Sequence, residues 1–144
     1  KNESYTSKLI NEINKRDLQQ NCKILGHLSK EDLKIMYKCA DIVISAPLEP
    51  EGFGRTISES LAMKKIILCY DYGGARDQLN GLDEIYKVSL HDQTEMKNKI
   101  DKIIKLSNPY KDNLGSISRR HVIKNFSKEK MLENYLNFYQ NIVL

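Results

Sequence analysis

The stretch DIVISAPLEPEGFGRTISES, Asp41 to Ser60, decides the fold of this chain. Its first part, Asp41–Ala46, is rich in β-branched residues and shows little alternation, which is typical of a strand buried on both faces of a sheet. A loop with two glycines, Gly52 and Gly54, follows, and a helix is predicted from about residue 56 to residue 64. A buried strand, a glycine loop and a helix in this order indicate a parallel α/β fold.

The same alternation of elements continues on both sides of this stretch. On the N-terminal side, Cys22–Gly26 is predicted to form a short strand, and Ser29–Asp32 reads as a capping box that starts a helix. On the C-terminal side, Ile66–Tyr70 is a second apolar strand and 85–90 is a further strand candidate. The expected fold class is α/β, a Rossmann-like parallel sheet flanked by helices.

Beyond residue 90 the pattern is helical. Asn108-Pro109 is expected to start one helix, with proline at its first position, and Ser127 is expected to cap the last one. Three aromatic residues of the last helix, Tyr135, Phe138 and Tyr139, are expected to pack rather than to stack on a ligand.

Composition excludes several classes of function. The net charge of +4 is mild and the lysines are scattered, so no nucleic-acid partner is predicted. Cys22, Cys39 and Cys69 form no CxxC and are expected to be buried, reduced thiols of a cytosolic protein. The three histidines share no ligand spacing, so no metal site is predicted. No apolar run reaches the ~18–20 residues of a membrane span, and there is no signal-peptide pattern.

Three loops are predicted to follow the carboxyl ends of strands, which is where parallel α/β sheets bind ligands. They are the glycine loop after Asp41–Ala46, the Asp71–Gly74 turn and the His27-Leu28 turn. The sequence therefore predicts a ligand crevice at this edge of the sheet.

The glycine loop has the features of an anion site. Gly52 and Gly54 let the backbone approach a ligand closely. The N–H groups of Gly54, Arg55 and Thr56 fall at or just before the first helical turn, where they have no intrahelical acceptor and carry the positive end of the helix dipole. Phosphate is the expected occupant.

Two carboxylates, Glu51 and Glu59, flank this predicted phosphate site. A carboxylate at position 59, about one helical turn in, can accept two hydrogen bonds from a vicinal diol such as the 2′ and 3′ hydroxyls of a ribose. Glu51 precedes the loop and would face the group attached beyond the phosphate. Each feature alone is common in proteins, but their combination and order predict a nucleotide sugar.

The segment DIVISAPLEPEGFGRTISESLAMKKIILCYDYGGARD resembles retaining GT-B glycosyltransferases of family 4, also called group 1 glycosyltransferases. The shared pattern is an ADIVV-type strand, E-G-F-G, seven residues between two glutamates, an apolar strand, and a GG turn followed by an acidic residue. The segments KILGHLSKEDLKIMYKCAD and RRHVIKNFSKEKMLENYLNFY resemble the flanking parts of the family. The resemblance covers nearly the whole chain from about Leu9.

The resemblance implies a role for nine residues. Glu51 would be the catalytic residue that binds the donor sugar's hydroxyls near the reacting carbon, Gly52, Phe53 and Gly54 would contact the sugar and phosphates through their backbone, Arg55 and Thr56 would lie at the phosphate end, Glu59 would hold the ribose, and the His27-Leu28 turn would lie beside the base. The family transfers a sugar from a nucleoside diphosphate sugar with retention, generally without a bound catalytic metal, so no cofactor is expected.

The resemblance also implies a larger protein. A GT-B enzyme has two Rossmann-like domains, and residues 1–144 correspond to part of the second, nucleotide-sugar-binding domain. The preceding strand with its diphosphate-binding Arg and Lys, and the N-terminal acceptor domain, are expected to be missing, so the chain alone is expected to be inactive. The full-length protein is expected to be a hexosyltransferase of cell-envelope glycan biosynthesis, cytoplasmic or at the inner face of the membrane by peripheral association.

Alternatives from other classes stay open at this point. A non-catalytic nucleotide-sugar-binding module would share the same scaffold, as would a GT-B-fold epimerase, for which no pair of base residues is recognisable. A receiver-like signalling domain is disfavoured, because Asp41 begins its strand and Asp71 has no acidic neighbours in sequence. The sugar, the base and the acceptor are not determined by the sequence.

Overall fold

A computed structural model describes residues 3–143 of the chain, with side chains over residues 5–142. The chain divides into two compact units, Lys1–Leu33 and Lys34–Leu144. The sheet lies entirely in the second unit.

The first unit contains the helix α1 (Glu3–Lys15) and the start of α2 (Lys30–Cys39). The N-terminus of α2 confirms half of the predicted capping box, because the Ser29 hydroxyl accepts the Asp32 N–H at 3.1 Å. In place of the reciprocal bond to the Ser29 backbone, the Asp32 carboxylate accepts the Ser29 hydroxyl at 2.8 Å. The predicted strand at Cys22–Gly26 is wrong: this stretch is coil, and its Ile24 is 46% exposed. A strand needs a neighbour to pair its N–H and C=O groups, and no strand lies among the described residues of this unit.

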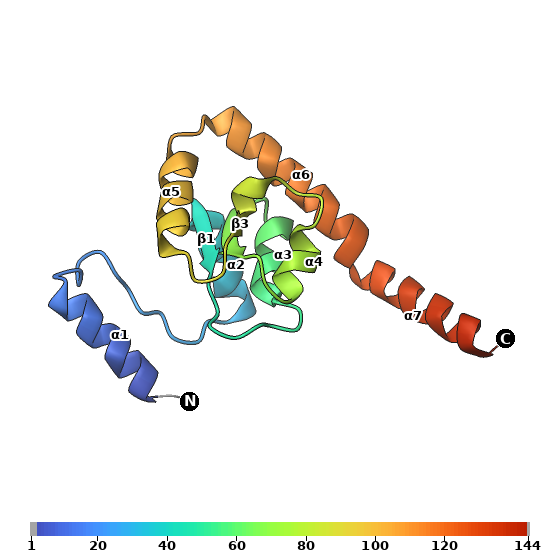
Figure 1. The fold of residues 1–144 in the computed structure, drawn as a ribbon, viewed down its shortest axis with the longest axis horizontal. Helices are drawn as coiled ribbons and strands as arrows, with labels where there is room; N and C mark the ends of the chain where they lie inside the picture. Colours follow the sequence, from blue (N-terminus) through green and yellow to red (C-terminus); the bar gives the residue numbers. More distant parts are fainter. Residues whose placement is uncertain (1–2, 144) are drawn as a thin grey trace. The chain divides into compact units, whose positions relative to one another are not determined.

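The second unit is built on a parallel sheet of three described strands in the order β1-β2-β3 (Figure 1). They are β1 (Ile42–Ser45), β2 (Ile66–Tyr70) and β3 (Lys87–Val88). All five residues of β2 are buried, as its apolar sequence predicts. Burial of β1 on both faces was also predicted and is wrong, since Ile44 is 49% exposed; β1 is an edge strand of this sheet.

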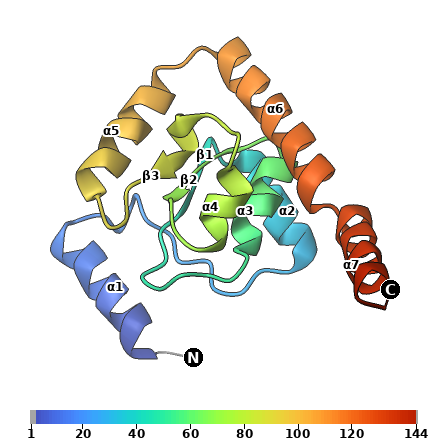
Figure 2. The same cartoon turned by 45° about the vertical axis from the view of Figure 1, so that its right-hand side comes forward.

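Helices connect and cover the strands, which confirms the predicted fold class. Helix α3 (Arg55–Ala62) leads from β1 to β2, and α4 (Gly74–Leu79) leads from β2 toward β3. The C-terminal part consists of α5 (Gln93–Ile104), α6 (Asn108–Phe126) and α7 (Lys128–Val143). Helix α6 runs along α3 (Figure 2), and a Cβ at Gly115 would lie only 2.4 Å from the carbonyl oxygen of Lys64. The hydrophobic core is formed mainly by residues of α3, β2 and α4, together with buried residues of α5 and α6.

The predicted strand at 85–90 is shorter than expected. The Asp83 carboxylate accepts the Ile85 N–H at 2.8 Å and starts a 3-10 turn, η1 (Glu84–Tyr86), so pairing with β2 is confined to Lys87 and Val88. Beyond Val88 the Ser89 N–H is bonded to the Glu95 carboxylate, which ends the strand.

Two further expectations about burial are wrong for the described residues. Cys69 is buried, but Cys22 and Cys39 are exposed. The aromatic residues of α7 do not pack into the core: Tyr135, Phe138 and Tyr139 are 55–60% exposed because no described element covers the face of α7 that carries them.

No helix among residues 3–143 combines the length and apolarity that a bilayer span requires.

Candidate functional site

The loop after β1 lies on the glycine turn after β2. The Gly74 N–H donates to the carbonyl oxygen of Glu51 at 2.9 Å. A Cβ at Gly74 would lie 2.5 Å from the carbonyl oxygen of Gly52 and 2.8 Å from the Cα of Phe53, so only glycine allows this contact. Gly73 has φ 56 and ψ −140, a conformation that side chains rarely adopt. Two of the three loops predicted to line one crevice therefore do meet, backbone against backbone.

A second contact holds the loop from α4. The side chain of Gln78 is completely buried, and its amide nitrogen donates to the carbonyl oxygens of Phe53 and Gly54, the latter at 3.3 Å. Sequence reasoning missed Gln78. The signal was a glutamine beside Ala75 and Leu79 on the buried side of a short helix, where an apolar residue is usual.

The loop enters α3 in the geometry of an anion site. Gly54 is the N-cap residue, with φ 78 and ψ 70 in the left-handed region, and no side chain caps the helix. In the first turn the Ile57 N–H donates to the Gly54 carbonyl oxygen at 3.0 Å, whereas the N–H groups of Gly54, Arg55 and Thr56 have no intrahelical acceptor and lie at the positive end of the helix dipole. This is the place where Gly54, Arg55 and Thr56 were predicted to meet phosphate.

The Glu51 carboxylate lies over this helix start. A Cβ at Gly54 would come within 3.1 Å of Glu51 Oε2. Among residues 5–142 no hydrogen-bond donor faces this carboxylate, which lines a small cavity at the ends of β1 and β2 together with Ser45, Cys69 and Tyr72. Burial, reinforced by the charges of Asp71 and Glu51, raises the pKa of the Cys69 thiol to about 12. Cys69 is therefore a neutral thiol in the wall of the cavity, and Glu51 is the acidic side chain that lines it.

The Glu59 carboxylate is fixed by two partners. Arg55 donates to Oε1 at 2.8 Å from one helical turn away, and the Tyr37 hydroxyl of α2 donates to Oε2 at 3.2 Å. Burial, and then the charge of Glu59, raise the pKa of Tyr37. Tyr37 was also missed, since its partner is 22 residues away and no local pattern connects them. A carboxylate has about four acceptor positions, so Glu59 retains the capacity to accept hydroxyl groups of a ligand.

The structure thus gathers most of the predicted site residues in one loop-to-helix joint, from Glu51 to Glu59. Arg55 is largely exposed and directed to Glu59, Thr56 is half-buried, and the ring of Phe53 packs edge-on against Phe126 at 6.0 Å between ring centroids. His27 and Leu28 belong to the first unit, in the coil before α2, and their contact with a base stays a prediction.

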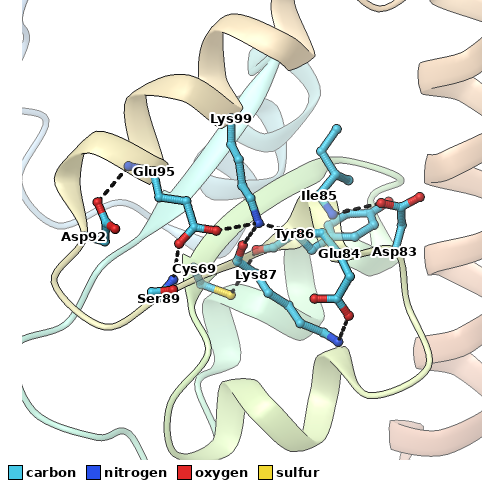
Figure 3. A network of polar contacts seen from close by, with 10 residues as sticks. All are labelled: Cys69, Asp83, Glu84, Ile85, Tyr86, Lys87, Ser89, Asp92, Glu95 and Lys99. Carbon is cyan, nitrogen blue, oxygen red and sulfur yellow. Dashed lines mark hydrogen bonds and ion pairs between the residues drawn. The ribbon is translucent and has the colours of Figure 1, made fainter.

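A second polar cluster, the β3-end network, lies after β3 (Figure 3). Glu95 accepts the Ser89 N–H at 2.7 Å and pairs with Lys99 at 3.0 Å. Lys99 also donates to the carbonyl oxygens of Glu84, at 2.7 Å, and Lys87. The bond from the Ser89 backbone, followed by side-chain bonds from Ser89 and Lys99, lowers the pKa of Glu95 to about 2. The charges of this network satisfy one another. Over residues 3–143, no group of three or more His, Cys, Asp or Glu side chains is arranged to hold a metal ion.

Comparison with known proteins identifies the family. The family model described as Glycosyl transferases group 1 matches residues 2–129. The chain belongs to this family. Among the relatives of this group 1 glycosyltransferase chain is the poly(ribitol-phosphate) alpha-N-acetylglucosaminyltransferase of Staphylococcus aureus (strain COL), 25% identical over 146 residues, which cover 96% of this chain and 27% of that protein.

Solved structures give the same fold. A glycosyltransferase from Rickettsia africae ESF-5 is 33% identical with a TM-score of 0.88, over 99% of this chain and 37% of that one. Anabaena Alr3699/HepE in complex with UDP and glucose is 20% identical with a TM-score of 0.84, over 96% of this chain and 37% of that one, and supports the fold alone. The GT-B expectation is confirmed at the level of the fold. The chain spans 37% of these two solved chains and 27% of the Staphylococcus aureus relative.

Proposed function

We propose that this chain is the donor-binding domain of a retaining glycosyltransferase of family 4, a hexosyltransferase type that takes its sugar from a nucleoside diphosphate sugar. The observation that carries the proposal is the loop-to-helix joint itself. The start of α3, which no described side chain caps, lies between Glu51, whose carboxylate has no hydrogen-bond partner among residues 5–142, and Glu59, whose carboxylate is held in place. The order of these groups fits sugar, diphosphate and ribose along one line.

The electrostatics of the joint suit the bond that breaks. When the donor's anomeric carbon separates from the diphosphate, negative charge grows on the departing phosphate oxygen. N–H groups fixed at a helix start are aimed at such a charge and need not reorganise during the reaction. In this proposal Gly52, Phe53 and Gly54 contact the sugar and phosphates, and Arg55 and Thr56 lie at the phosphate end.

The carboxylates act on the two ends of the donor. Glu51 accepts hydrogen bonds from the sugar hydroxyls near the reacting carbon, and Glu59 accepts them from the ribose. Tyr37 supports the second role because it holds one oxygen of Glu59 in a defined position. No metal is needed in this scheme, since the diphosphate charge is met by N–H groups and Arg55.

The relatives support the wider setting of the proposal. The Staphylococcus aureus relative is named as an N-acetylglucosaminyltransferase acting on poly(ribitol-phosphate), and HepE has been solved with UDP and with UDP-glucose. We extend this to cell-envelope glycan synthesis from a cytoplasmic donor, at the inner face of the membrane or in solution. The acceptor would be bound by the larger part of the protein that this chain does not span.

The proposal is tested by titrating the chain with UDP, GDP and ADP while its backbone amides are followed by NMR, which detects millimolar binding. We expect shifts at Gly52–Glu59 with one of the three nucleotides. Because a hydrogen bond to a charged group contributes roughly 1.5–3 kcal/mol, Glu59→Ala should weaken binding by about 10- to 100-fold.

Glu133→Ala is the matched control. Glu133 is an exposed helical glutamate in an ion pair with Lys130, outside the joint, so its loss should leave binding unchanged. Absence of shifts with all three nucleotides, or equal effects of the two alanine variants, would contradict the proposal.

A further inference from the structure

The hydrogen bonds that the buried side-chain amide of Gln78 makes among the described residues all go to the loop of the site. Gln78 is 0% exposed, and the two atoms that face its amide nitrogen are the carbonyl oxygens of Phe53 and Gly54. Because both facing atoms are acceptors, the nitrogen end of the amide has to point toward them.

This contact fixes the direction of two N–H groups. In a trans peptide the C=O and the N–H point in opposite directions. A Phe53 carbonyl directed at Gln78 therefore turns the Gly54 N–H away from Gln78. A Gly54 carbonyl that accepts from both Gln78 and the Ile57 N–H, at 3.0 Å, turns the Arg55 N–H outward in the same way. These are two of the N–H groups at the start of α3.

The other end of the amide argues against a packing role. Gln78 Oε1 is buried and has no hydrogen-bond partner among the described residues. A buried acceptor without a partner is unfavourable, and a methionine of similar size would fill the same space without one. The glutamine is therefore explained by what its nitrogen does to the loop.

Gln78 is itself held from α6. The imidazole Nε2 of His121 lies 2.9 Å from the carbonyl oxygen of Gln78, and His121 packs against Phe126, which in turn contacts the Phe53 ring. Helix α6 thus contacts both partners of the bond: His121 contacts the Gln78 backbone, and Phe126 contacts the Phe53 ring. The position from which the Gln78 side chain bonds the loop is therefore fixed by α6.

We infer that Gln78 is a positioning residue for the diphosphate: it orients the Gly54 and Arg55 N–H groups toward the phosphates without touching the ligand. The inference rests on the proposed function, since it assigns a means of holding the diphosphate at that same site. It predicts that Gln78 matters for the phosphate part of a nucleotide and not for its nucleoside part.

The experiment compares a nucleoside diphosphate with its nucleoside. Wild-type chain, Gln78→Met and Ser118→Ala are titrated with UDP and with uridine by NMR, or with GDP or ADP and the matching nucleoside if that is the nucleotide that binds. Ser118 is a suitable control because it is also 0% exposed and bonded to Tyr86, away from the loop. We expect Gln78→Met to weaken UDP binding about tenfold, to leave uridine binding unchanged, and to shift the Gly54 and Arg55 amides of the free chain. Ser118→Ala should alter neither affinity.

Each other outcome is decisive. No response of the wild-type chain to any nucleotide overturns the proposed function and this inference with it. If the wild type binds, two results for Gln78→Met overturn the inference alone. One is an unchanged affinity for UDP, and the other is a loss of affinity by the same factor for UDP and uridine. Gln78→Asn, which keeps an amide but is too short to reach the loop, serves as a second variant. If both variants fail to fold, Gln78 is structural and the inference is wrong.

Discussion

Two polar regions lie after strands of the same sheet, and they are built in opposite ways. The site joint, Glu51 to Glu59, is held by backbone contacts: glycine against carbonyl at Gly74, and amide against carbonyl at Gln78. Its charged groups are left facing outward. The β3-end network is held by its charged groups: Glu95 and Lys99 pair with each other and also bond backbone groups within the network.

The difference shows which polar cluster is available to a ligand. Both clusters have acids and bases close together, and in the β3-end network the pKa of Glu95 is lowered to about 2. A low pKa there reports that the carboxylate is already satisfied. At the site joint the contacts that hold the loop, at Gly74 and Gln78, are between uncharged groups, and the ion pair Arg55–Glu59 lies on the helix. The carboxylate of Glu51 and the N–H groups at the start of α3 therefore remain available to a ligand. Changes in the two regions should therefore separate binding from stability.

The largest effect is expected from Gly74→Ala. The added Cβ would overlap the backbone of Gly52 and Phe53, which has no flexible side chain that could move aside. Overpacking of this kind costs about 1–3 kcal/mol of stability. The displaced loop would also misplace N–H groups that are proposed to bind phosphate, and each bond to a charged group contributes about 1.5–3 kcal/mol, or about 10- to 100-fold in affinity. We expect a loss of nucleotide affinity of about a hundredfold, measured by NMR titration.

Gly81→Asn is the control for this change. Gly81 also has positive φ, but a Cβ there would meet open space, and asparagine tolerates the left-handed region. Its nucleotide affinity should match that of the wild type. A folded Gly74→Ala chain with wild-type affinity would show that the close contact at Gly74 is not needed for nucleotide binding.

Lys99→Met should produce the next largest effect, and on stability alone. Lys99 is 20% exposed and donates to two carbonyl oxygens and one carboxylate, all of which lose a charged donor. Such bonds contribute about 1.5–3 kcal/mol each at most, so we expect the free energy of unfolding to fall by about 2 kcal/mol in urea denaturation. Nucleotide affinity should not change.

Lys97→Met provides the comparison, since Lys97 is 75% exposed and pairs only with Asp101. Surface pairs contribute about 0–1 kcal/mol, so this variant should be close to wild type. Reduced nucleotide affinity in Lys99→Met would mean that the β3-end network and the site joint are coupled, so that the network does not act on stability alone.

The sequence predicted local features well and non-local ones poorly. The Ser29 cap, the buried strand at Ile66–Tyr70 and the glycine entry to α3 depend on neighbours in the chain, and all were recognisable. The supports of the site were not: Gln78 bonds the loop 24 and 25 residues before it, and Tyr37 bonds Glu59 across 22 residues. The strand expected at Cys22–Gly26 fails for the same reason, because a strand is defined by a partner that its own residues do not specify.

A smaller effect on binding is expected from Tyr37→Phe. The ring stays buried, but the bond from its hydroxyl to Glu59 Oε2 is lost, and Arg55 alone then orients the carboxylate. A typical hydrogen bond contributes about 1 kcal/mol, which corresponds to about fivefold in nucleotide affinity. Tyr86→Phe is the matched control, since it removes a buried hydroxyl that is bonded to Ser118 instead. Equal affinities of the two variants would show that Glu59 needs no second partner.

The smallest effect is a pH dependence that belongs to the β3-end network. The pKa of Glu95 is about 2 in the folded chain, below its ordinary value of 4.5, so the ionised form is favoured by folding. Its contribution to stability is complete above about pH 4.5 and is lost as the pH falls toward 2. Glu95→Gln should therefore be less stable than wild type at pH 7, and the difference in stability should narrow as the pH is lowered from about 4.5 toward 2. Glu133→Gln, at an exposed pair, should show no such closing gap in the same urea series. A gap that is constant with pH would mean that the Glu95 carboxylate is not held by its charge, and that the network stabilises the chain only through the shape of its hydrogen bonds.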